Sequence, residues 1–436
     1  MESMEERFGA LVDRGDSVEL EKAVQTTVER HNAWRNEECI NMHAGKNVMS
    51  HKAIQLLASP GWVDNGVSGN IGSRNATGVR FIDELESLTV ALLRKLFGAR
   101  YVEYRAMSGS VANGIALSAL TSPGDTIMVV PRRHYGHYTY AEDGYPRHLG
   151  LRVKEIPFTD DGFELDIEAF KARAIELRPS LIVVGTSIYL FPTPLTEMRR
   201  IADSMGARII YDGAHVLGLI AGGQFQDPLS EGAHILVGST QKTFPGPIGG
   251  VLACNDDDIA AQVSRTTSAL FSNYCNNRVA SLAISAAETM RFGREYAARV
   301  LSNARAVAEA LDSEGLLVLG KAYGYTASHQ VILDTKSIGG AKRAAELLER
   351  VNIICTRFAL SSDYPHSLKN PNGIRLGVSA VSRLGMGSNE MKKIASYIKL
   401  AFTYPERAEE VKRDVRDLAA RFRTVHYSFD IEKTVS

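Results

Sequence analysis

The stretch from residue 208 to residue 250 contains two short apolar segments, RIIYD at 208–212 and HILVGSTQK at 234–242, and each ends in a charged side chain. Segments of this length that are rich in Ile, Leu and Val are typical of buried β-strands. A charged residue at the C-terminal end of a parallel strand faces the crevice in which α/β folds bind ligands. The stretch therefore predicts that Asp212 and Lys242 lie at two strand ends beside one ligand-binding crevice.

An aspartate and a lysine at such positions favour the chemistry of pyridoxal 5'-phosphate. The lysine forms a Schiff base with the aldehyde of this cofactor, and the aspartate pairs with its pyridinium nitrogen. Asp212 must stay ionised to keep the ring nitrogen protonated, whereas Lys242 must lose its proton, which burial near a cationic ring favours. Taken singly, the aspartate is typical of a turn or helix cap and the lysine of a solvated surface. The spacing, the strand-end context and the small residues before Lys242 together indicate the cofactor.

Strands and helices alternate on both sides of this stretch. Helices of about 10–15 residues between strands predict βαβ units and an α/β fold with a mostly parallel sheet. The alternation ends near residue 255, and a long helical stretch at 278–311 leads into a mixed region. We expect an N-terminal helical arm at 1–50, a large cofactor-binding α/β domain at 51–311 and a small α+β domain at 312–436. The expected strands include 126–130, 151–156, 181–186, 208–211, 234–238 and 250–254, and the expected helices include 81–97, 133–142, 165–177 and 195–205.

The composition excludes several classes of function. The 436 residues include 50 Lys and Arg against 50 Asp and Glu, with no basic cluster of the kind that binds nucleic acid. The four cysteines lie far apart, so we expect neither a disulfide framework nor a metal site. The longest apolar runs fall far short of the ~20 residues of a membrane span. These features predict a soluble, cytoplasmic protein, and the zero net charge favours an oligomer.

At this point the sequence resembles serine hydroxymethyltransferases. DGAHVLGL at 212–219 is similar to their D-x-A-H-x-x-G-L segment, and STQKT at 239–243 with the following GP and GG resembles T-T-H-K-T-L-R-G-P-R-G-G. The resemblance implies fold type I of the pyridoxal-phosphate-dependent transferases, which is aspartate aminotransferase-like and has a mostly parallel seven-stranded sheet. It also implies a homodimer with shared active sites. Further motifs that match in the expected order are SGSVAN at 108–113, HYGH at 134–137, GTSIY at 185–189 and GIRLG at 373–377.

The resemblance implies a role for each matched residue. Lys242 carries the cofactor, Asp212 holds the ring N–H, and Arg375 binds the substrate carboxylate through a bidentate pair that orients one Cα bond. His137 stacks on the ring, where it either helps to move the β-hydroxyl proton or only packs. The N-terminus of the helix that begins in the SGSVAN motif at 108–113 binds the cofactor phosphate. The remaining predicted cofactor contacts are Ser108, Gly109 and Ser110 at the phosphate, Ser187 and His215 at the ring oxygen, Ser239 and Gln241 beside the lysine, and Gly249 and Gly250 from the other subunit.

Several residues of the family pattern are missing. MHAGKNVMS at 42–50 aligns with L-I-A-S-E-N-F-T-S, so that the family's catalytic glutamate falls on Lys46 and a carboxylate-contacting serine falls on Gly45. In the loop at 66–78, aromatic contacts to phosphate, substrate and folate become Gly66, Asn75 and Ala76. A folate site needs an aromatic platform and an acid–base carboxylate. The losses predict a folate-independent enzyme, unless the alignment of this loop is shifted by one or two residues and another glutamate takes the role.

A closer likeness is to the folate-independent threonine transaldolases of antibiotic pathways. Those enzymes cleave threonine to acetaldehyde and a glycyl unit, and they add this unit to another aldehyde. The resemblance implies a transferase or aldolase whose substrates are β-hydroxy-α-amino acids and aldehydes. Lys46 would then attract an anionic aldehyde, act as a neutral base, or be only a partly solvated side chain. The matching segments are KTFPGP at 242–247, FGREYAA at 292–298, SNA at 302–304, YGYT at 323–326, HQ at 329–330, RLGM at 383–386 and YSFD at 427–430.

Three other functions stay open at this point. One is true serine hydroxymethyl transfer. Another is a racemase or aminotransferase on the same scaffold, which would break the Cα–H bond instead of Cα–Cβ. The third is a non-catalytic interaction protein, against which the joint presence of Lys242, Asp212 and Arg375 argues.

Overall fold

A computed structural model describes residue 9 and residues 11–59, 69–159, 162–271, 273–366 and 368–431 of the chain. At its centre is a seven-stranded sheet in the order β4-β10-β9-β8-β7-β5-β6. The predicted α/β fold is confirmed, since strands β5 to β9 pair in parallel and only β10 pairs antiparallel, with β9 and β4. The strands are β4 (Tyr101–Glu103), β5 (Thr126–Val129), β6 (Arg152–Glu155), β7 (Leu181–Gly185), β8 (Arg208–Asp212), β9 (Ile235–Ser239) and β10 (Gly250–Cys254).

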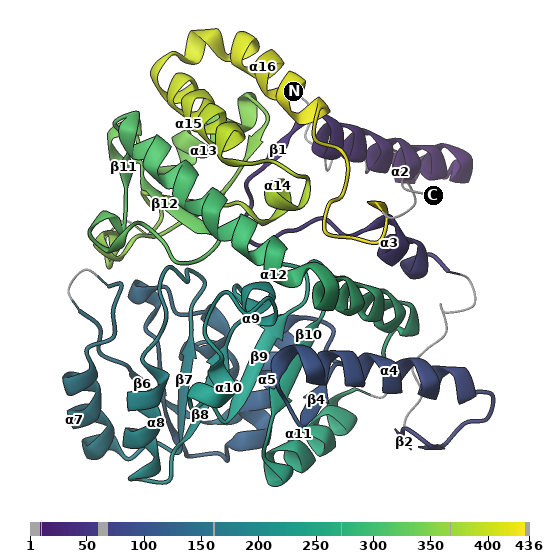
Figure 1. Ribbon diagram of the computed structural model, residues 1–436, viewed down its shortest axis with the longest axis vertical. Coiled ribbons are helices and arrows are strands. Elements are labelled where there is room, and N and C mark those ends of the chain that lie inside the picture. The colour runs from purple at the N-terminus through teal and green to yellow at the C-terminus, as the bar shows by residue number, and fades with distance from the viewer. Residues whose placement is uncertain are drawn as a thin grey trace.

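Both faces of this sheet are covered, which explains why the interiors of its central strands are apolar. Neighbouring residues of β8 belong to different clusters of buried side chains, with Ile210 on one face and Ile209 and Tyr211 on the other. A parallel sheet buried on both sides requires such uninterrupted apolar strands. Helices pack around it (Figure 1). They are α4 (Arg80–Phe97), α5 (Gly109–Leu120), α6 (Tyr145–Leu149), α7 (Ile167–Leu177), α8 (Leu195–Asp203), α9 (Leu217–Ala221), α10 (Pro228–Glu231) and α11 (Asp257–Leu270).

The prediction of a helix at 133–142 is wrong. Two single turns stand there instead, η3 (Arg132–His134) and η4 (Tyr138–Tyr140). Between them the chain reverses at Tyr135, whose φ is 70°, and Gly136 forms a bridge with Thr186 beyond β7. A Cβ atom on Gly136 would lie 1.9 Å from the Val130 carbonyl oxygen. Tertiary contact with the end of β7 therefore overrides the local helical preference.

The long helix α12 (Asn276–Ser313) connects the two parts of the molecule. Figure 1 shows it running across the middle, with the large sheet on one side and the small sheet on the other. Its 38 residues contact α4 and α9 of the large part and α15 (Ser388–Thr403) of the small part. A buried ion pair, Arg383 to Glu288, joins it to α14 (Ser379–Arg383) at an N–O distance of 2.8 Å. The helix therefore fixes the two parts against each other.

The C-terminal part contains a four-stranded antiparallel sheet in the order β11-β12-β15-β14. The N-terminal segment joins this part, because β1 (Ile40–Asn41) pairs in parallel with β13 (Ile353–Ile354). The predicted α+β character is confirmed, whereas the domain boundaries stay predictions. The other elements here are α2 (Ser17–Asn32), η1 (Ala33–Glu38), α3 (His51–Leu57), β11 (Leu317–Val318), β12 (Gln330–Asp334), α13 (Ala341–Arg350), β14 (Thr356–Phe358), β15 (Gly373–Gly377), α15 (Ser388–Thr403) and α16 (Ala408–Ala420).

Two further observations concern the described ranges only. None of their helices is long and apolar enough to cross a bilayer. They also contain no group of three or more His, Cys, Asp or Glu side chains arranged to hold a metal ion.

Candidate active site

A cavity of about 640 Å³ lies where the large sheet meets the small one. Ser187, His215 and Lys242 enter it from the segments that follow β7, β8 and β9, and Arg375 enters it from β15 of the small sheet. The structure thus brings together residues that are far apart in sequence and that we predicted for one site. The other lining residues are His43, Gly45, Arg132, Tyr135, Gly136, His137, Tyr138, Ile188, Phe358, Ala359, Tyr364, Leu368 and Pro371.

Asp212 is the last residue of β8 and is buried beside the cavity. Its Oδ1 accepts a hydrogen bond from the backbone N–H of Ala214, and its Oδ2 accepts one from the Nδ2 of Asn113, both over 3.0 Å. Gly185 lies opposite Asp212 in β7, and a Cβ there would come within 2.4 Å of the Asp212 Cβ. These two donors fix the position of the carboxylate at the end of β8. Asn113 lies in the SGSVAN motif, but we did not predict it as a site residue.

His137 is held through the same asparagine. The Asn113 Nδ2 also donates to the Thr139 Oγ1 (3.0 Å), and the Thr139 hydroxyl is 2.7 Å from the Nδ1 of His137. The Thr139 backbone N–H donates to that Nδ1 over 3.4 Å. Burial lowers the pKa of His137, and the Lys242 and Arg375 cations act in the same direction while Asp212 opposes them. A neutral imidazole whose Nδ1 accepts carries its proton on Nε2.

Lys242 lies in a loop that several hydrogen bonds hold in place. Asn47 donates from Nδ2 to the Lys242 carbonyl oxygen (2.7 Å), and the Thr243 hydroxyl donates to the His215 carbonyl oxygen (2.9 Å). Burial lowers the pKa of Lys242 to about 8, and the Asp212 carboxylate opposes this change. A lysine with such a pKa is deprotonated for a sizeable fraction of the time near neutral pH, which a nucleophilic amine requires.

Gln330, the first residue of β12, connects the two sheets at the cavity, and sequence reasoning did not find it as a site residue. Its Nε2 is 3.0 Å from the Nδ1 of His215 and donates to the Ser187 carbonyl oxygen over 3.1 Å. Arg375 donates from Nη1 to that same oxygen over 2.5 Å. Burial lowers the pKa of Arg375 to about 10, so it stays charged at neutral pH. The sequence did contain a sign of this residue, because the HQ pair at 329–330 resembles the threonine transaldolases, but that resemblance assigned no role to Gln330.

The predicted phosphate contacts gather around the N-terminus of α5. The Ser108 hydroxyl caps this helix by accepting from the Val111 N–H over 3.2 Å. Gly109 lies so close to Ser239 that a Cβ would come within 2.0 Å of the Ser239 Oγ. Gly250 donates its N–H to the Ala106 carbonyl oxygen over 2.8 Å. Ser110 lies in the first turn of α5, whereas Gln241 and Gly249 lie in the loop between β9 and β10. The N-terminus of α5 favours an anion there.

The residues present fit pyridoxal 5'-phosphate. The Nε of Arg375 and the Oε1 of Gln241 are buried and have no protein partner among the described residues. They are available to a polar ligand, because a buried polar atom without a partner is costly. In this site the Lys242 amine would hold the aldehyde carbon, Asp212 the ring nitrogen and α5 the phosphate. When bound, the cofactor supplies an electron sink for the bonds at the amino-acid Cα.

Lys46 does not line the cavity. It is exposed, and its neighbours His43 and Gly45 form the wall instead. Its role as a substrate contact stays a prediction. Asn75 and Ala76 are also exposed, while Gly66 lies outside the described residues.

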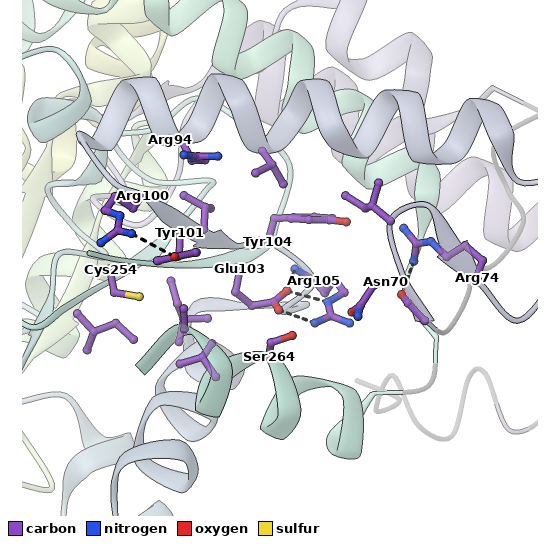
Figure 2. A pocket seen from close by; sticks show the side chains of 18 residues that line it. Asn70, Arg74, Arg94, Arg100, Tyr101, Glu103, Tyr104, Arg105, Cys254 and Ser264 are labelled. Carbon is purple, nitrogen blue, oxygen red and sulfur yellow. Dashed lines mark hydrogen bonds and ion pairs between the residues drawn. The ribbon is translucent and has the colours of Figure 1, made fainter. Parts of the chain in front are cut away.

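A second cavity of about 520 Å³ lies beside β4, α4 and α11 (Figure 2). Its walls carry the charged residues Arg74, Arg94, Arg100, Glu103 and Arg105. Arg105 donates from Nε to the Glu103 Oε1 over 2.9 Å. Within the part of the chain that the structure describes, no residue that we predicted for the site lines this second cavity. It is therefore separate from the cavity that holds Lys242.

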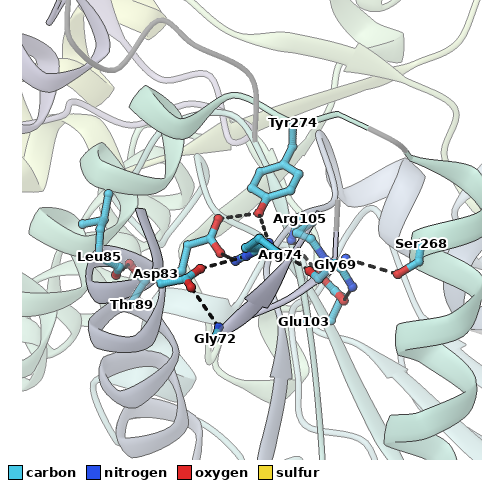
Figure 3. A network of polar contacts seen from close by, with 11 residues as sticks. Gly69, Gly72, Arg74, Asp83, Leu85, Thr89, Glu103, Arg105, Ser268 and Tyr274 are labelled. Atoms are coloured by element: carbon cyan, nitrogen blue, oxygen red, sulfur yellow. Dashed lines mark hydrogen bonds and ion pairs between the residues drawn. The ribbon is translucent and has the colours of Figure 1, made fainter. Parts of the chain in front are cut away.

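A polar network beside it anchors the segment at 69–74 to α4 (Figure 3). Arg74 donates from Nε to the Asp83 Oδ1 over 2.8 Å, and its Nη2 forms an ion pair with the buried Glu86. The Tyr274 hydroxyl donates to the same Glu86 carboxylate. Because these charges are paired and the side chains of Arg74 and Glu86 are buried, we interpret the network as structural.

The fold and the cavity define a class of protein, the fold type I pyridoxal-phosphate enzymes. Comparison with known proteins narrows this class. The family model for serine hydroxymethyltransferase matches residues 18–398. The chain is 38% identical over 420 residues to the serine hydroxymethyltransferase of Aeropyrum pernix, with 96% of this chain and 95% of that one covered. It is 41% identical over 408 residues to that of Pyrobaculum neutrophilum, with 93% and 94% covered.

The protein therefore belongs to the serine hydroxymethyltransferase family and is a pyridoxal-phosphate-dependent enzyme of the transferase and aldolase type. A solved structure of L-threonine transaldolase from Pseudomonas fluorescens has the same fold. It superposes with a TM-score of 0.85 at 24% sequence identity, and 96% of each chain is covered. The predicted resemblance, fold class and cofactor are confirmed.

Proposed function

We propose that this enzyme breaks and forms the Cα–Cβ bond of β-hydroxy-α-amino acids without folate. In this proposal it transfers the glycyl unit of L-threonine to an aldehyde, as a threonine transaldolase of a cytoplasmic biosynthetic pathway. One observation carries the proposal. Among the described residues, no aspartate or glutamate lines the cavity that contains Lys242 and Arg375.

The missing carboxylate matters because folate chemistry requires an acid–base group close to the one-carbon unit. The family pattern has its glutamate at the position of Lys46, whose side chain is exposed here. The lining of the cavity instead includes aromatic and basic side chains, among them Tyr138, Tyr364, Phe358 and Arg132. Such a wall suits an aldehyde with an aromatic or anionic substituent.

The chain's own residues would orient the amino acid. The Arg375 guanidinium is partly buried and donates to the Ser187 carbonyl oxygen, so it would hold the substrate carboxylate at a fixed place. When the substrate carboxylate is held at Arg375 and the substrate amine is held near Lys242, the amino acid can no longer rotate about its Cα. The orientation that is fixed in this way decides which bond at Cα breaks. Asp212, fixed by Asn113 and Ala214, would keep the ring nitrogen protonated.

The test is a product screen with the holoenzyme. L-Threonine should release acetaldehyde, and addition of a second aldehyde such as benzaldehyde should yield a new β-hydroxy-α-amino acid. L-Serine with tetrahydrofolate should give little methylene-tetrahydrofolate. Efficient turnover of serine with folate would contradict the proposal.

True serine hydroxymethyl transfer is the second candidate, because the curated relatives at 38–41% identity carry that name. It would need a carboxylate that reaches the cavity from outside the described residues or from a second subunit. The same product screen distinguishes the two functions, since only this candidate requires tetrahydrofolate.

We also propose a homodimer with shared active sites. Met107 and Ile248 are 44% and 57% exposed, although they directly precede the predicted phosphate contacts Ser108 and Gly249. Exposed apolar side chains next to a binding site suit a protein interface. Light scattering should show a dimer, which Ile248→Asp should weaken and which Ile175→Asp, at a 56% exposed site on α7, should not.

A further inference from the structure

His43 reaches the cavity from a segment that is fixed on its other side. The neighbours Met42 and Ala44 are fully buried. Met42 donates its N–H to the Ile354 carbonyl oxygen and accepts from the Gly377 N–H, each over 2.8 Å. His43 follows at the start of a turn, in which the Lys46 N–H donates to the His43 carbonyl oxygen over 3.1 Å. Its side chain lines the cavity with Lys242 and Arg375.

The backbone of residue 45 determines which nitrogen of His43 is free. The Gly45 N–H donates to the His43 Nδ1 over 3.0 Å, so Nδ1 is an acceptor. Burial lowers the pKa of His43 to about 4, and the charges of Arg375, Arg35 and Lys46 act in the same direction. The ring is therefore neutral at physiological pH, and its proton is on Nε2. His43 offers the cavity a neutral N–H donor.

Gly45 makes this arrangement sterically feasible. A Cβ on residue 45 would lie 3.0 Å from the His43 Cε1 and 3.4 Å from its Nδ1. Any larger side chain would therefore press on the ring. The family pattern has serine at position 45. The two changes therefore depend on each other, because glycine in place of this serine leaves room for the ring of His43.

We propose that His43 is a catalytic residue that donates its Nε2–H to the oxygen on the substrate Cβ. The proposal rests on the proposed function, in which this oxygen is the β-hydroxyl of the amino acid and the carbonyl oxygen of the aldehyde. When the Cα–Cβ bond forms, negative charge develops on this oxygen. A fixed donor in a shielded cavity stabilises that charge. The hydrogen bond itself transfers no proton. The proton that converts the alkoxide into the β-hydroxyl group comes from water, and it returns to water when the bond is cleaved.

The test separates chemistry at the Cβ oxygen from chemistry at Cα. The exchange of the glycine Cα proton with deuterated water involves no Cβ oxygen, whereas threonine cleavage does. His43→Phe keeps the size of the ring but removes the donor, so cleavage should fall about 100-fold while glycine exchange and glycine affinity change less than about 3-fold. In His43→Gln the amide nitrogen can occupy the place of Nε2, so this variant should recover much of the cleavage rate. His51→Phe, at an exposed histidine, is the control.

Two measurements do not depend on turnover. Nitrogen-15 NMR of the wild-type protein should show His43, identified by its absence in His43→Phe, neutral and protonated on Nε2 at pH 7. If His43→Phe does not fold, Gly45→Ala displaces the ring and should lower cleavage selectively. Cleavage that persists in His43→Phe, an equal loss of glycine exchange, or a proton on Nδ1 would overturn the role of His43. A wild-type enzyme that exchanges the glycine proton but cleaves no β-hydroxy amino acid would instead overturn the proposed function, and this role with it.

Discussion

Asn113 donates a hydrogen bond from its Nδ2 to the Oδ2 of Asp212 over 3.0 Å. The same nitrogen donates to Thr139, whose hydroxyl contacts the Nδ1 of His137. One asparagine on α5 therefore connects the carboxylate predicted at the ring nitrogen with the imidazole predicted on the ring face. A rigid pair of groups requires no rearrangement when the cofactor binds, and such preorganisation lowers the free-energy cost of binding.

The first prediction concerns this asparagine. Asn113→Ala leaves one Asp212 oxygen without its buried donor, and hydrogen bonds to charged groups contribute about 1.5–3 kcal/mol. We expect cofactor affinity to fall about 10- to 100-fold, measured by absorbance titration of the apoprotein. Asn70→Ala, at an exposed amide, should leave the affinity unchanged. If Asn113→Ala bound the cofactor with wild-type affinity, the hydrogen bond from Asn113 to Asp212 would contribute nothing to cofactor binding.

The second prediction is a pH profile for Lys242. Only the neutral amine attacks an aldehyde, and burial lowers the pKa of Lys242 from 10.5 to about 8. The rate of covalent cofactor attachment to the apoprotein should therefore rise about tenfold per pH unit below pH 8 and level off above it. Stopped-flow absorbance measures this rate.

Lys242→Ala should abolish the covalent absorbance band, whereas Lys154→Ala, at an exposed lysine on β6, should not. A rate that keeps rising beyond pH 10 would mean that the amine keeps its ordinary pKa.

The third prediction concerns Arg375. Arg375→Ala removes the partly buried cation that we propose for the substrate carboxylate, so glycine affinity should fall at least about 30-fold, which corresponds to about 2 kcal/mol. Cofactor affinity should change far less, and equilibrium titrations measure both. Arg357→Ala, at an exposed arginine on the adjacent β14, is the matched control. An equal loss of both affinities would indicate a structural role.

The fourth prediction concerns the ion pair between Glu288 of α12 and Arg383 of α14. Arg383→Met leaves the Glu288 carboxylate buried without its partner, and the free energy of unfolding should fall by about 3–5 kcal/mol. The exposed pair Arg199–Asp203 is the control, because its loss in Arg199→Met should cost at most about 1 kcal/mol. Urea unfolding followed by circular dichroism measures both. Equal midpoints would show that the buried pair contributes no more than the exposed one.

Local sequence was sufficient wherever a strand is buried on both faces. RIIYD and the apolar run before Lys242 predicted β8 and β9, since an uninterrupted apolar segment of this length fits a covered parallel sheet. The same reasoning failed at 133–142, where the chain bends around the end of β7. That bend depends on Gly136 and Thr186, which lie 50 residues apart and meet only in the folded chain.

The sequence by itself predicted the cofactor and the site that we place around Asp212 and Lys242, because strand ends, small residues and an ordered set of motifs are properties of the chain. Tertiary structure alone decided the composition of the cavity wall. It brought Gln330 and Arg375 from the small sheet onto the Ser187 carbonyl, and it turned His43 inward while Lys46 stayed outside. The physical reason is that backbone hydrogen bonds of Met42 with Ile354 and Gly377 hold this segment against the small sheet. The chain then turns at Ala44 and Gly45, so that His43 and Lys46 lie at opposite ends of the turn.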